Sequence, residues 1–144
     1  MARMISVGEI APEFSGLDSE GRTLCLAELL KNGPVCLVFY PADNTPVCTT
    51  QLCELRDNWA EIQKRGVQVI GVNPASIDNH KAFAQKHSFP FPLIHDKGAK
   101  IAKAYGAHLL LGLIIRTVYL IGTDAKVLFA QRGKPSVTEI LATL

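Results

Sequence analysis

Short apolar runs alternate with segments of helical pattern along this chain, and that order leaves few folds open. Residues 34–40 (PVCLVFY) and 67–72 (VQVIGV) have strand length and are almost wholly apolar, as strands covered on both faces are. Between them, residues 46 to about 65 follow a helical pattern that ends before Gly66. A strand, a helix and another strand in this order predict a βαβ crossover and a central sheet with helices on both sides.

The remaining strand-like segments lie towards the two ends of the chain. Residues 14–17 and 23–26 flank a turn and predict an N-terminal β-hairpin followed by a short helix. Residues 117–121 and 126–131 predict a second hairpin, which adds antiparallel pairing to the sheet.

The predicted architecture is therefore α/β, with a central mixed β-sheet flanked by helices. Further helices are expected at residues 77–87, 98–105 and 135–144, and a short edge strand, where Pro92 is tolerable, at residues 91–94. No internal repeat or linker-like stretch divides the 144 residues. We expect a single domain over residues 1–144.

The charge balance argues against two classes of partner. There are 15 Lys and Arg residues against 13 Asp and Glu, a formal net charge of +2, and no basic block stands out. This predicts no nucleic-acid partner. The longest apolar run, residues 108–115, ends at Arg116 and is far shorter than the roughly 20 residues of a membrane span, so we expect no membrane association.

The four cysteines are more informative than the charge. They are Cys25, Cys36, Cys48 and Cys53. Four are too few for a disulfide scaffold, and the N-terminus has no apolar signal-peptide core, so we expect a cytoplasmic protein with reduced thiols. A close cysteine pair is then catalytic, redox-sensing or metal-binding, but spacings of 11, 12 and 5 residues do not match a zinc site. Cys25 and Cys36 lie in apolar runs and are expected in the core.

The helical pattern places Cys48 in the first turn of the helix that begins near residue 46. Thr45 fits the N-cap, and Pro46 fits the first helical position. Unpaired N–H groups and the positive end of the helix dipole favour an anion there, so this thiol is expected to tend toward the reactive thiolate. An ordinary buried thiol is the alternative, and the helix pattern alone leaves both open.

Residues 41–51 (PADNTPVCTTQ) resemble the peroxidatic signature of the peroxiredoxins, and Cys53 resembles the resolving cysteine of the bacterioferritin-comigratory, or Q-type, subfamily. Residues 7–14, 35–41 and 116–121 resemble the opening, the first core strand and the arginine-bearing strand of the same family. The resemblance covers nearly the whole chain. It implies a thioredoxin-like fold and the reduction of peroxides by a thiol.

The resemblance implies two chemical steps and a recycling reaction. Cys48 would attack hydrogen peroxide or an alkyl hydroperoxide and become a sulfenic acid. Cys53 would condense with it to an intramolecular disulfide. A thioredoxin or glutaredoxin-like dithiol would then reduce that disulfide by exchange.

The same resemblance assigns helpers to Cys48. Thr45 would hydrogen-bond the peroxide, and Arg116 would hold a permanent positive charge beside the thiolate and the breaking O–O bond. The substrate pocket would be lined by Pro41, Pro46 and Val47. No metal or cofactor would take part.

The spacing of the two cysteines sets a separate condition. Five residues of α-helix separate Cα atoms by about 8 to 9 Å, whereas a disulfide tolerates about 7 Å at most. If Cys48 and Cys53 share one helix, its start must unwind before they can bond.

The chain departs from the Q-type pattern near the site. Val47 stands where many members have Gly and is expected to narrow access to Cys48. Gln51 stands where many have Glu and removes a charge. Gly122 stands where an Asp is common. None of these changes deletes the nucleophile.

Several alternatives stay open. A non-enzymatic thiol redox sensor would begin with the same thiolate attack, and a disulfide oxidoreductase could use the same fold, although it usually has Cys-x-x-Cys. A monomer and a homodimer both fit the sequence. His80 and His87 are expected on a solvated helix. Residues 109–115 are expected to wall the peroxide pocket or form an interface, with core packing as the alternative.

Overall fold

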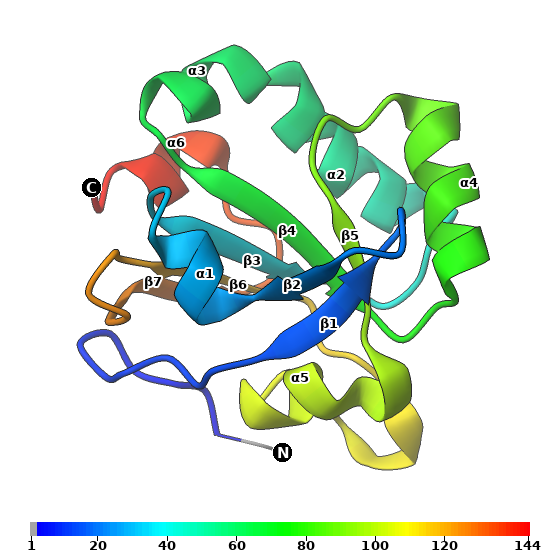
Figure 1. Cartoon of the computed structure of the whole chain (residues 1–144), viewed down its shortest axis with the longest axis horizontal. Helices are drawn as coiled ribbons and strands as arrows, with labels where there is room; N and C mark the ends of the chain where they lie inside the picture. Colours follow the sequence, from blue (N-terminus) through cyan, green and yellow to red (C-terminus); the bar gives the residue numbers. More distant parts are fainter. Residues whose placement is uncertain (1–2) are drawn as a thin grey trace.

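The computed structural model describes residues 3–144, which form one mixed sheet with helices on both faces (Figure 1). The strands are β1 (Ser15–Asp18), β2 (Thr23–Cys25), β3 (Val35–Phe39), β4 (Gln68–Asn73), β5 (Leu93–His95), β6 (Thr117–Ile121) and β7 (Val127–Arg132). The helices are α1 (Leu26–Leu30), α2 (Pro46–Asp57), α3 (Trp59–Lys64), α4 (Ile77–His87), α5 (Lys100–Ala104) and α6 (Val137–Leu141), with short 3-10 turns η1 (Lys97–Ala99) and η2 (Leu110–Gly112). The seven strands follow the order β2-β1-β5-β4-β3-β6-β7, so the predicted α/β architecture with a central mixed sheet is confirmed.

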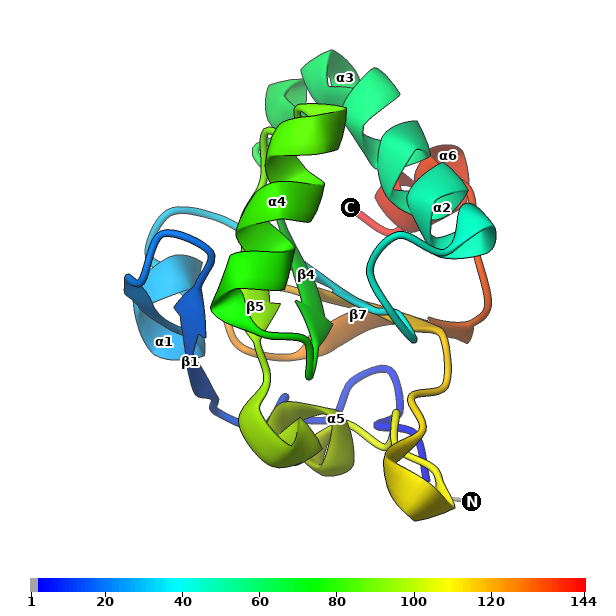
Figure 2. The ribbon, with the colours of Figure 1, turned by 90° about the vertical axis from the view of Figure 1, so that its right-hand side faces the viewer.

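β3 is covered on both faces, as its apolar run predicts. It pairs parallel with β4 and antiparallel with β6, and all five of its residues are buried. Alternate side chains face opposite layers: one set packs with α1 and α5, the other with α2, α3, α4 and α6. These sets are Val35, Leu37 and Phe39, and Cys36 and Val38. Figure 2 shows the four helices together over one face and α5 beneath the other.

Both predicted hairpins are confirmed, but the predicted edge strand does not lie at an edge. β1 pairs antiparallel with β2, and β6 pairs antiparallel with β7. β5 lies inside the sheet, parallel to β4 and antiparallel to β1, so the edge assignment is wrong. Pro92 is tolerated because it precedes the strand, and its carbonyl accepts a hydrogen bond from the Gly71 N–H at 3.0 Å.

The helix expected from residue 46 to about 65 is in fact two helices. Asn58 separates α2 from α3 and has φ −104° and ψ 19°. Its side-chain amide donates to the Glu54 carbonyl at 2.8 Å, a local bond of the kind that competes with helix continuation. The break follows from this one residue, and it leaves the start of α2 as predicted.

The other helices follow their predicted order with some shorter bounds. α4 has its predicted bounds and is capped by Ser76. α5 begins later than predicted because Gly98 and Ala99 have left-handed φ of 67° and 57°. α6 begins after the reciprocal capping box of Ser136 and Glu139. Among the helices of residues 3–144, none is both long and apolar enough to cross a membrane.

The sheet register brings the ends of β3 and β4 and the start of β6 to the same end of the sheet. Phe39 at the end of β3 pairs with Thr117 at the start of β6 and with Val72 near the end of β4. Because β6 runs antiparallel to β3, the residue before β6 emerges where β3 ends. The loop leading into α2, Arg116 and the end of β4 therefore meet at this end of the sheet.

Candidate active site

Cys48 lies in the first turn of α2, as the sequence predicts. Thr45 has the extended backbone of an N-cap, with φ −85° and ψ 147°, and Pro46 is the first helical residue. Cys48 is buried, with 1% of the residue exposed. The residue belongs to the first turn of a 12-residue helix, and the unpaired N–H groups and positive dipole end of such a turn stabilise an anion.

Thr45 occupies the N-cap position, but its side chain does not cap the helix. Its hydroxyl donates instead to the Ala42 carbonyl at 3.4 Å, within the loop that precedes α2. A hydrogen bond of this length is weak. The half-buried hydroxyl can therefore exchange this contact for an oxygen atom bound beside Cys48.

Arg116, the residue before β6, brings a positive charge to the Cys48 sulfur. Its guanidinium donates from Nη2 to Cys48 Sγ at 3.2 Å and from Nη1 to Gln51 Oε1 at 2.7 Å. A guanidinium keeps its charge and offers several donors in one plane. This contact places a permanent positive charge beside the sulfur at the start of the helix.

Gln51 holds the guanidinium in place, a role that the sequence pattern did not reveal. It is buried and lies three residues after Cys48, so both side chains meet Arg116 from the same face of α2. From the family resemblance we noted only that Gln51 lacks the charge of a Glu. The i, i+3 spacing of Cys48 and Gln51 was the sequence signal that both side chains lie on one face of the helix.

Cys53 lies in the same helix and is half-buried. All four cysteines are free, so the structure describes the dithiol form. The five-residue spacing within α2 separates the Cys48 and Cys53 Cα atoms by about 8 to 9 Å, beyond the reach of a disulfide. A disulfide between Cys48 and Cys53 therefore requires the start of α2 to unwind.

The residues predicted to line the pocket are at the surface. Pro41, Pro46 and Val47 are exposed, Val47 by 48%. Pro46 and Val47 directly precede Cys48 in α2, and because both are exposed they do not enclose the thiol. A separate cavity of about 470 Å³ lies between α4 and the turn joining β1 to β2. No cysteine lines that cavity, and none of the predicted site residues does, so we place the chemistry at Cys48.

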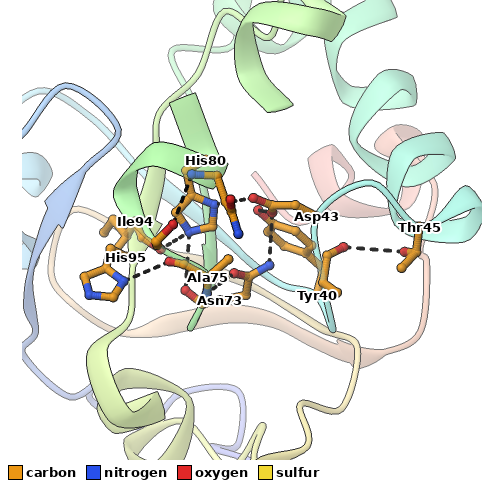
Figure 3. Close-up of polar contacts among 11 residues, drawn as sticks. Tyr40, Asp43, Thr45, Asn73, Ala75, His80, Ile94 and His95 are labelled. Carbon is orange, nitrogen blue, oxygen red and sulfur yellow. Dashed lines mark hydrogen bonds and ion pairs between the residues drawn. The ribbon is translucent and has the colours of Figure 1, made fainter. Parts of the chain in front are cut away.

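A buried polar network anchors the loop before α2 (Figure 3). Asp43 Oδ2 lies 2.8 Å from His80 Nδ1 on α4. Asp43 Oδ1 accepts hydrogen bonds from the Tyr40 hydroxyl at 2.7 Å and from the Asn73 amide at 3.2 Å. The sequence did not predict this network, because its members are distant along the chain.

The two histidines of α4 are not on a solvated face, so that prediction is wrong. His80 and Phe83 are three residues apart and both 0% exposed, which places them on the face toward the sheet. His87 is half-buried and stacks on Phe89 with ring centroids 5.5 Å apart. The spacing of His80 and Phe83 was a signal that could have corrected the first assignment.

Comparison with known families covers most of the chain. The model of the AhpC/TSA family matches residues 7–130. The chain belongs to the AhpC/TSA family. The match includes every predicted site residue, from Pro41 to Arg116.

Relatives of this AhpC/TSA-family chain include Q-type peroxiredoxins, which confirms the resemblance seen in the sequence. It is 43% identical over 102 residues to the chloroplastic peroxiredoxin Q of Triticum aestivum, covering 71% of this chain and 46% of that protein. It is 42% identical over 102 residues to the chloroplastic peroxiredoxin Q of Sedum lineare, covering 71% and 54%. The chain thus spans about half the length of these curated relatives.

Solved structures confirm the thioredoxin-like fold expected for an AhpC/TSA-family chain. The peroxidoxin BcpB of Mycobacterium tuberculosis is 32% identical and matches with a TM-score of 0.91, over 98% of this chain and 96% of that one. A bacterioferritin comigratory protein of Xanthomonas campestris is 25% identical, with a TM-score of 0.80 over 90% and 86%.

The two other cysteines of this AhpC/TSA-family chain differ from each other. Cys36 is a core residue of β3, and burial raises the pKa of its thiol to about 12, so it stays protonated. Cys25 ends β2 and is half-buried. The core prediction is confirmed for Cys36 and wrong for Cys25. Within residues 3–144, no three His, Cys, Asp or Glu side chains are grouped so that they could hold a metal ion.

The apolar segment before Arg116 is a narrow loop with its tip in solvent. The Leu109 N–H donates to the Leu113 carbonyl at 2.7 Å, across the turn η2. Leu111 and Leu113 are 96% and 59% exposed, whereas Ile114 is buried. The alternative prediction of core packing is therefore wrong for Leu111 and Leu113 and confirmed for Ile114. A role as pocket wall or interface stays a prediction.

Proposed function

We propose that this AhpC/TSA-family protein is a thiol-dependent peroxidase that reduces hydrogen peroxide and alkyl hydroperoxides. The observation that carries the proposal is the 3.2 Å contact between the Arg116 guanidinium and the Cys48 sulfur at the start of α2. The Xanthomonas campestris protein, which is described for its alkyl peroxide reduction activity, supports the choice of substrate.

In the first step, the Cys48 thiolate attacks the terminal oxygen of the hydroperoxide. An S–O bond forms as the O–O bond breaks, so the sulfur is oxidised to a sulfenic acid. The departing hydroxide or alkoxide takes up a proton and leaves as water or alcohol. Arg116 stabilises negative charge first on the sulfur and then on the departing oxygen. The Thr45 hydroxyl and the Cys48 N–H are the donors that hold the peroxide in line.

In the second step, the Cys53 thiol attacks the sulfenic sulfur of Cys48. A disulfide forms and water is released. A thioredoxin or glutaredoxin-like dithiol then reduces the disulfide by exchange and is itself oxidised. The half-buried position of Cys53 on the same helix supports this pairing.

Steady-state turnover tests the proposal. With NADPH, thioredoxin reductase and thioredoxin, the protein is expected to consume hydrogen peroxide or tert-butyl hydroperoxide over many cycles. A single stoichiometric oxidation without turnover would indicate a redox sensor instead. Disulfide transfer to reduced proteins in the absence of peroxide would indicate a disulfide oxidoreductase. The cytoplasmic location and the monomeric or homodimeric state stay predictions.

Formation of the Cys48–Cys53 disulfide is expected to lower amide-exchange protection over residues 46–54, because the first turns of α2 must open to bring the thiols together. Hydrogen exchange followed by mass spectrometry on the dithiol and peroxide-oxidised forms measures this directly. Cys53→Ser is the control. After one equivalent of peroxide it keeps dithiol-like protection, because no internal disulfide forms. Near-identical protection in the two forms of the wild type contradicts the unwinding step.

Gln51→Leu is expected to slow oxidation of Cys48 by about tenfold, the equivalent of one hydrogen bond to a charged group. The apolar side chain keeps the buried volume but no longer accepts from Arg116 Nη1, so the guanidinium loses its fixed orientation. Gln51→Glu retains an acceptor and is expected to lose less. Stopped-flow oxidation of the reduced proteins measures both. Equal rates for Gln51→Leu and wild type would show that Gln51 does not position Arg116.

A further inference from the structure

Asp43 and His80 form a buried pair that none of the steps above uses. His80 Nδ1 lies 2.8 Å from Asp43 Oδ2, and the two side chains are 0% and 4% exposed. Asp43 belongs to the loop between β3 and α2, two residues before Thr45, whereas His80 lies 37 positions later on α4. The pair therefore joins the loop that leads into Cys48 to a separate helix (Figure 3).

The acceptors around His80 determine where its protons are. Nε2 lies 2.9 Å from the Ile94 carbonyl oxygen and 3.4 Å from the Asn73 carbonyl oxygen. Carbonyl oxygens only accept, so Nε2 carries a proton. Nδ1 faces a carboxylate whose other oxygen already has two donors. His80 therefore bridges the Ile94 carbonyl through Nε2 and the Asp43 carboxyl group through Nδ1.

Asp43 is held from three elements at once. Besides His80 on α4, its donors are Asn73 at the end of β4 and Tyr40 just after β3. Tyr40 is fully buried in the same packed cluster as Cys48. Burial, and next the charge of Asp43, raise the pKa of Tyr40 well above its ordinary value, so its hydroxyl stays a donor.

The loop before α2 has few local contacts that fix its conformation, and the Asp43–His80 pair supplies a long-range one. Asn44, between Asp43 and Thr45, has a left-handed φ of 63°, which is uncommon outside glycine although Asn adopts it more readily than most residues. The Thr45 contact to the Ala42 carbonyl is long, at 3.4 Å. A buried polar pair adds little net stability, because the cost of desolvating both groups offsets their attraction. Its position before the first turn of α2 therefore indicates a role in geometry.

We propose that His80 is a positioning residue of the peroxidase site, because its pair with Asp43 fixes the loop that presents Thr45 and Cys48 to the peroxide. The inference rests on the proposed peroxidase function. Arg116 comes to Cys48 from a different element, the start of β6. Loss of the anchor therefore leaves Arg116 in place and displaces the Thr45 hydroxyl that donates to the peroxide. A displacement of about 1 Å at such groups can slow a reaction about 100-fold.

Two substitutions of His80 separate its bond to Asp43 from its bond to the Ile94 carbonyl. His80→Asn places an amide N–H near the position of Nδ1 and keeps a donor for Asp43. His80→Gln places the amide near the position of Nε2 and keeps a donor for the carbonyl instead. Each variant loses one ring hydrogen bond and keeps the other, so the two are chemically matched.

Two reactions of Cys48 are compared in each variant, oxidation by hydrogen peroxide and alkylation by iodoacetamide. Alkylation needs only an accessible thiolate, whereas oxidation also needs the donors of the loop and first turn. We expect His80→Gln to slow oxidation by about ten- to 100-fold and to leave alkylation within about threefold of wild type. His80→Asn is expected to stay within about threefold of wild type in both reactions.

Oxidation of His80→Gln at the wild-type rate overturns the proposal, and so does an equal loss in His80→Asn and His80→Gln. If His80→Gln does not fold, Asp43→Ala replaces it. That variant removes the hydrogen-bond partner of His80 from the other side of the pair, and it too must lose oxidation and keep alkylation. Failure of the peroxidase function itself would appear differently, as a wild-type protein that consumes no peroxide.

Discussion

The Cys48→Ser variant is expected to consume no peroxide above the uncatalysed background. A serine hydroxyl is far less acidic than a thiol, so neither the helix start nor the Arg116 guanidinium produces a nucleophile there. No second thiol can take over in place, because Cys36 is buried in β3 and Cys53 belongs to the next turns of α2. Peroxide consumption with a thioredoxin system, followed by NADPH absorbance, gives the result.

Cys25→Ser is the matched control for Cys48→Ser. It is the same substitution at a half-buried cysteine at the end of β2, an outer strand of the sheet. This variant is expected to keep wild-type turnover. Mass spectrometry of the peptide that spans Cys48 and Cys53 shows in each protein whether the disulfide has formed. Turnover that persists in Cys48→Ser would move the nucleophile to another residue and refute the site.

Arg116→Met is expected to lower the second-order rate constant for oxidation of Cys48 by about 10²- to 10³-fold, the usual loss when one fixed donor to developing charge is removed. The methionine fills the half-buried space but offers neither charge nor donor, so the Cys48 sulfur and Gln51 Oε1 both lose their partner. Rapid-mixing oxidation of the reduced protein measures the constant without any contribution from the reductant.

Arg116→Lys separates charge from geometry in the same experiment. Lysine restores the positive charge as a compact ammonium, but it lacks the planar fork that contacts Cys48 and Gln51 together. An intermediate rate is expected. If Arg116→Met oxidises within about threefold of wild type, the electrostatic role assigned to this arginine is wrong.

The sheet could be predicted largely from the sequence because its central strands carry their own signal. The apolar runs that form β3 and β4 are buried on both faces, and each hairpin has a turn between extended pieces. The place of β5 could not be predicted from Pro92. This proline precedes the first residue of the strand and therefore does not confine the strand to an edge of the sheet. The end of α2 depends on one side-chain bond from Asn58, which no periodicity contains.

The site was predictable where its residues are neighbours in the chain. Thr45, Pro46 and Cys48 form one local signal for a helix start. Arg116 entered through the family resemblance, and the structure brings it to the thiol. The pairing of Asp43 with His80 is a tertiary contact, and a helical pattern shows which face His80 occupies but not which side chain it meets. Such pairings need the fold.

The register between β3 and β6 limits how the length of this chain can change. Five residue pairs define it, from Val35 with Ile121 to Phe39 with Thr117, and alternate side chains enter opposite layers. Deleting one residue within β6 would send its apolar side chains to the wrong layers and turn Arg116 away from the thiol. The tip formed by residues 109–113 is under no such constraint, because Leu111 and Leu113 already lie in solvent. Insertions are therefore tolerated best at that tip, which makes it the place to graft a fluorescent reporter or an affinity tag.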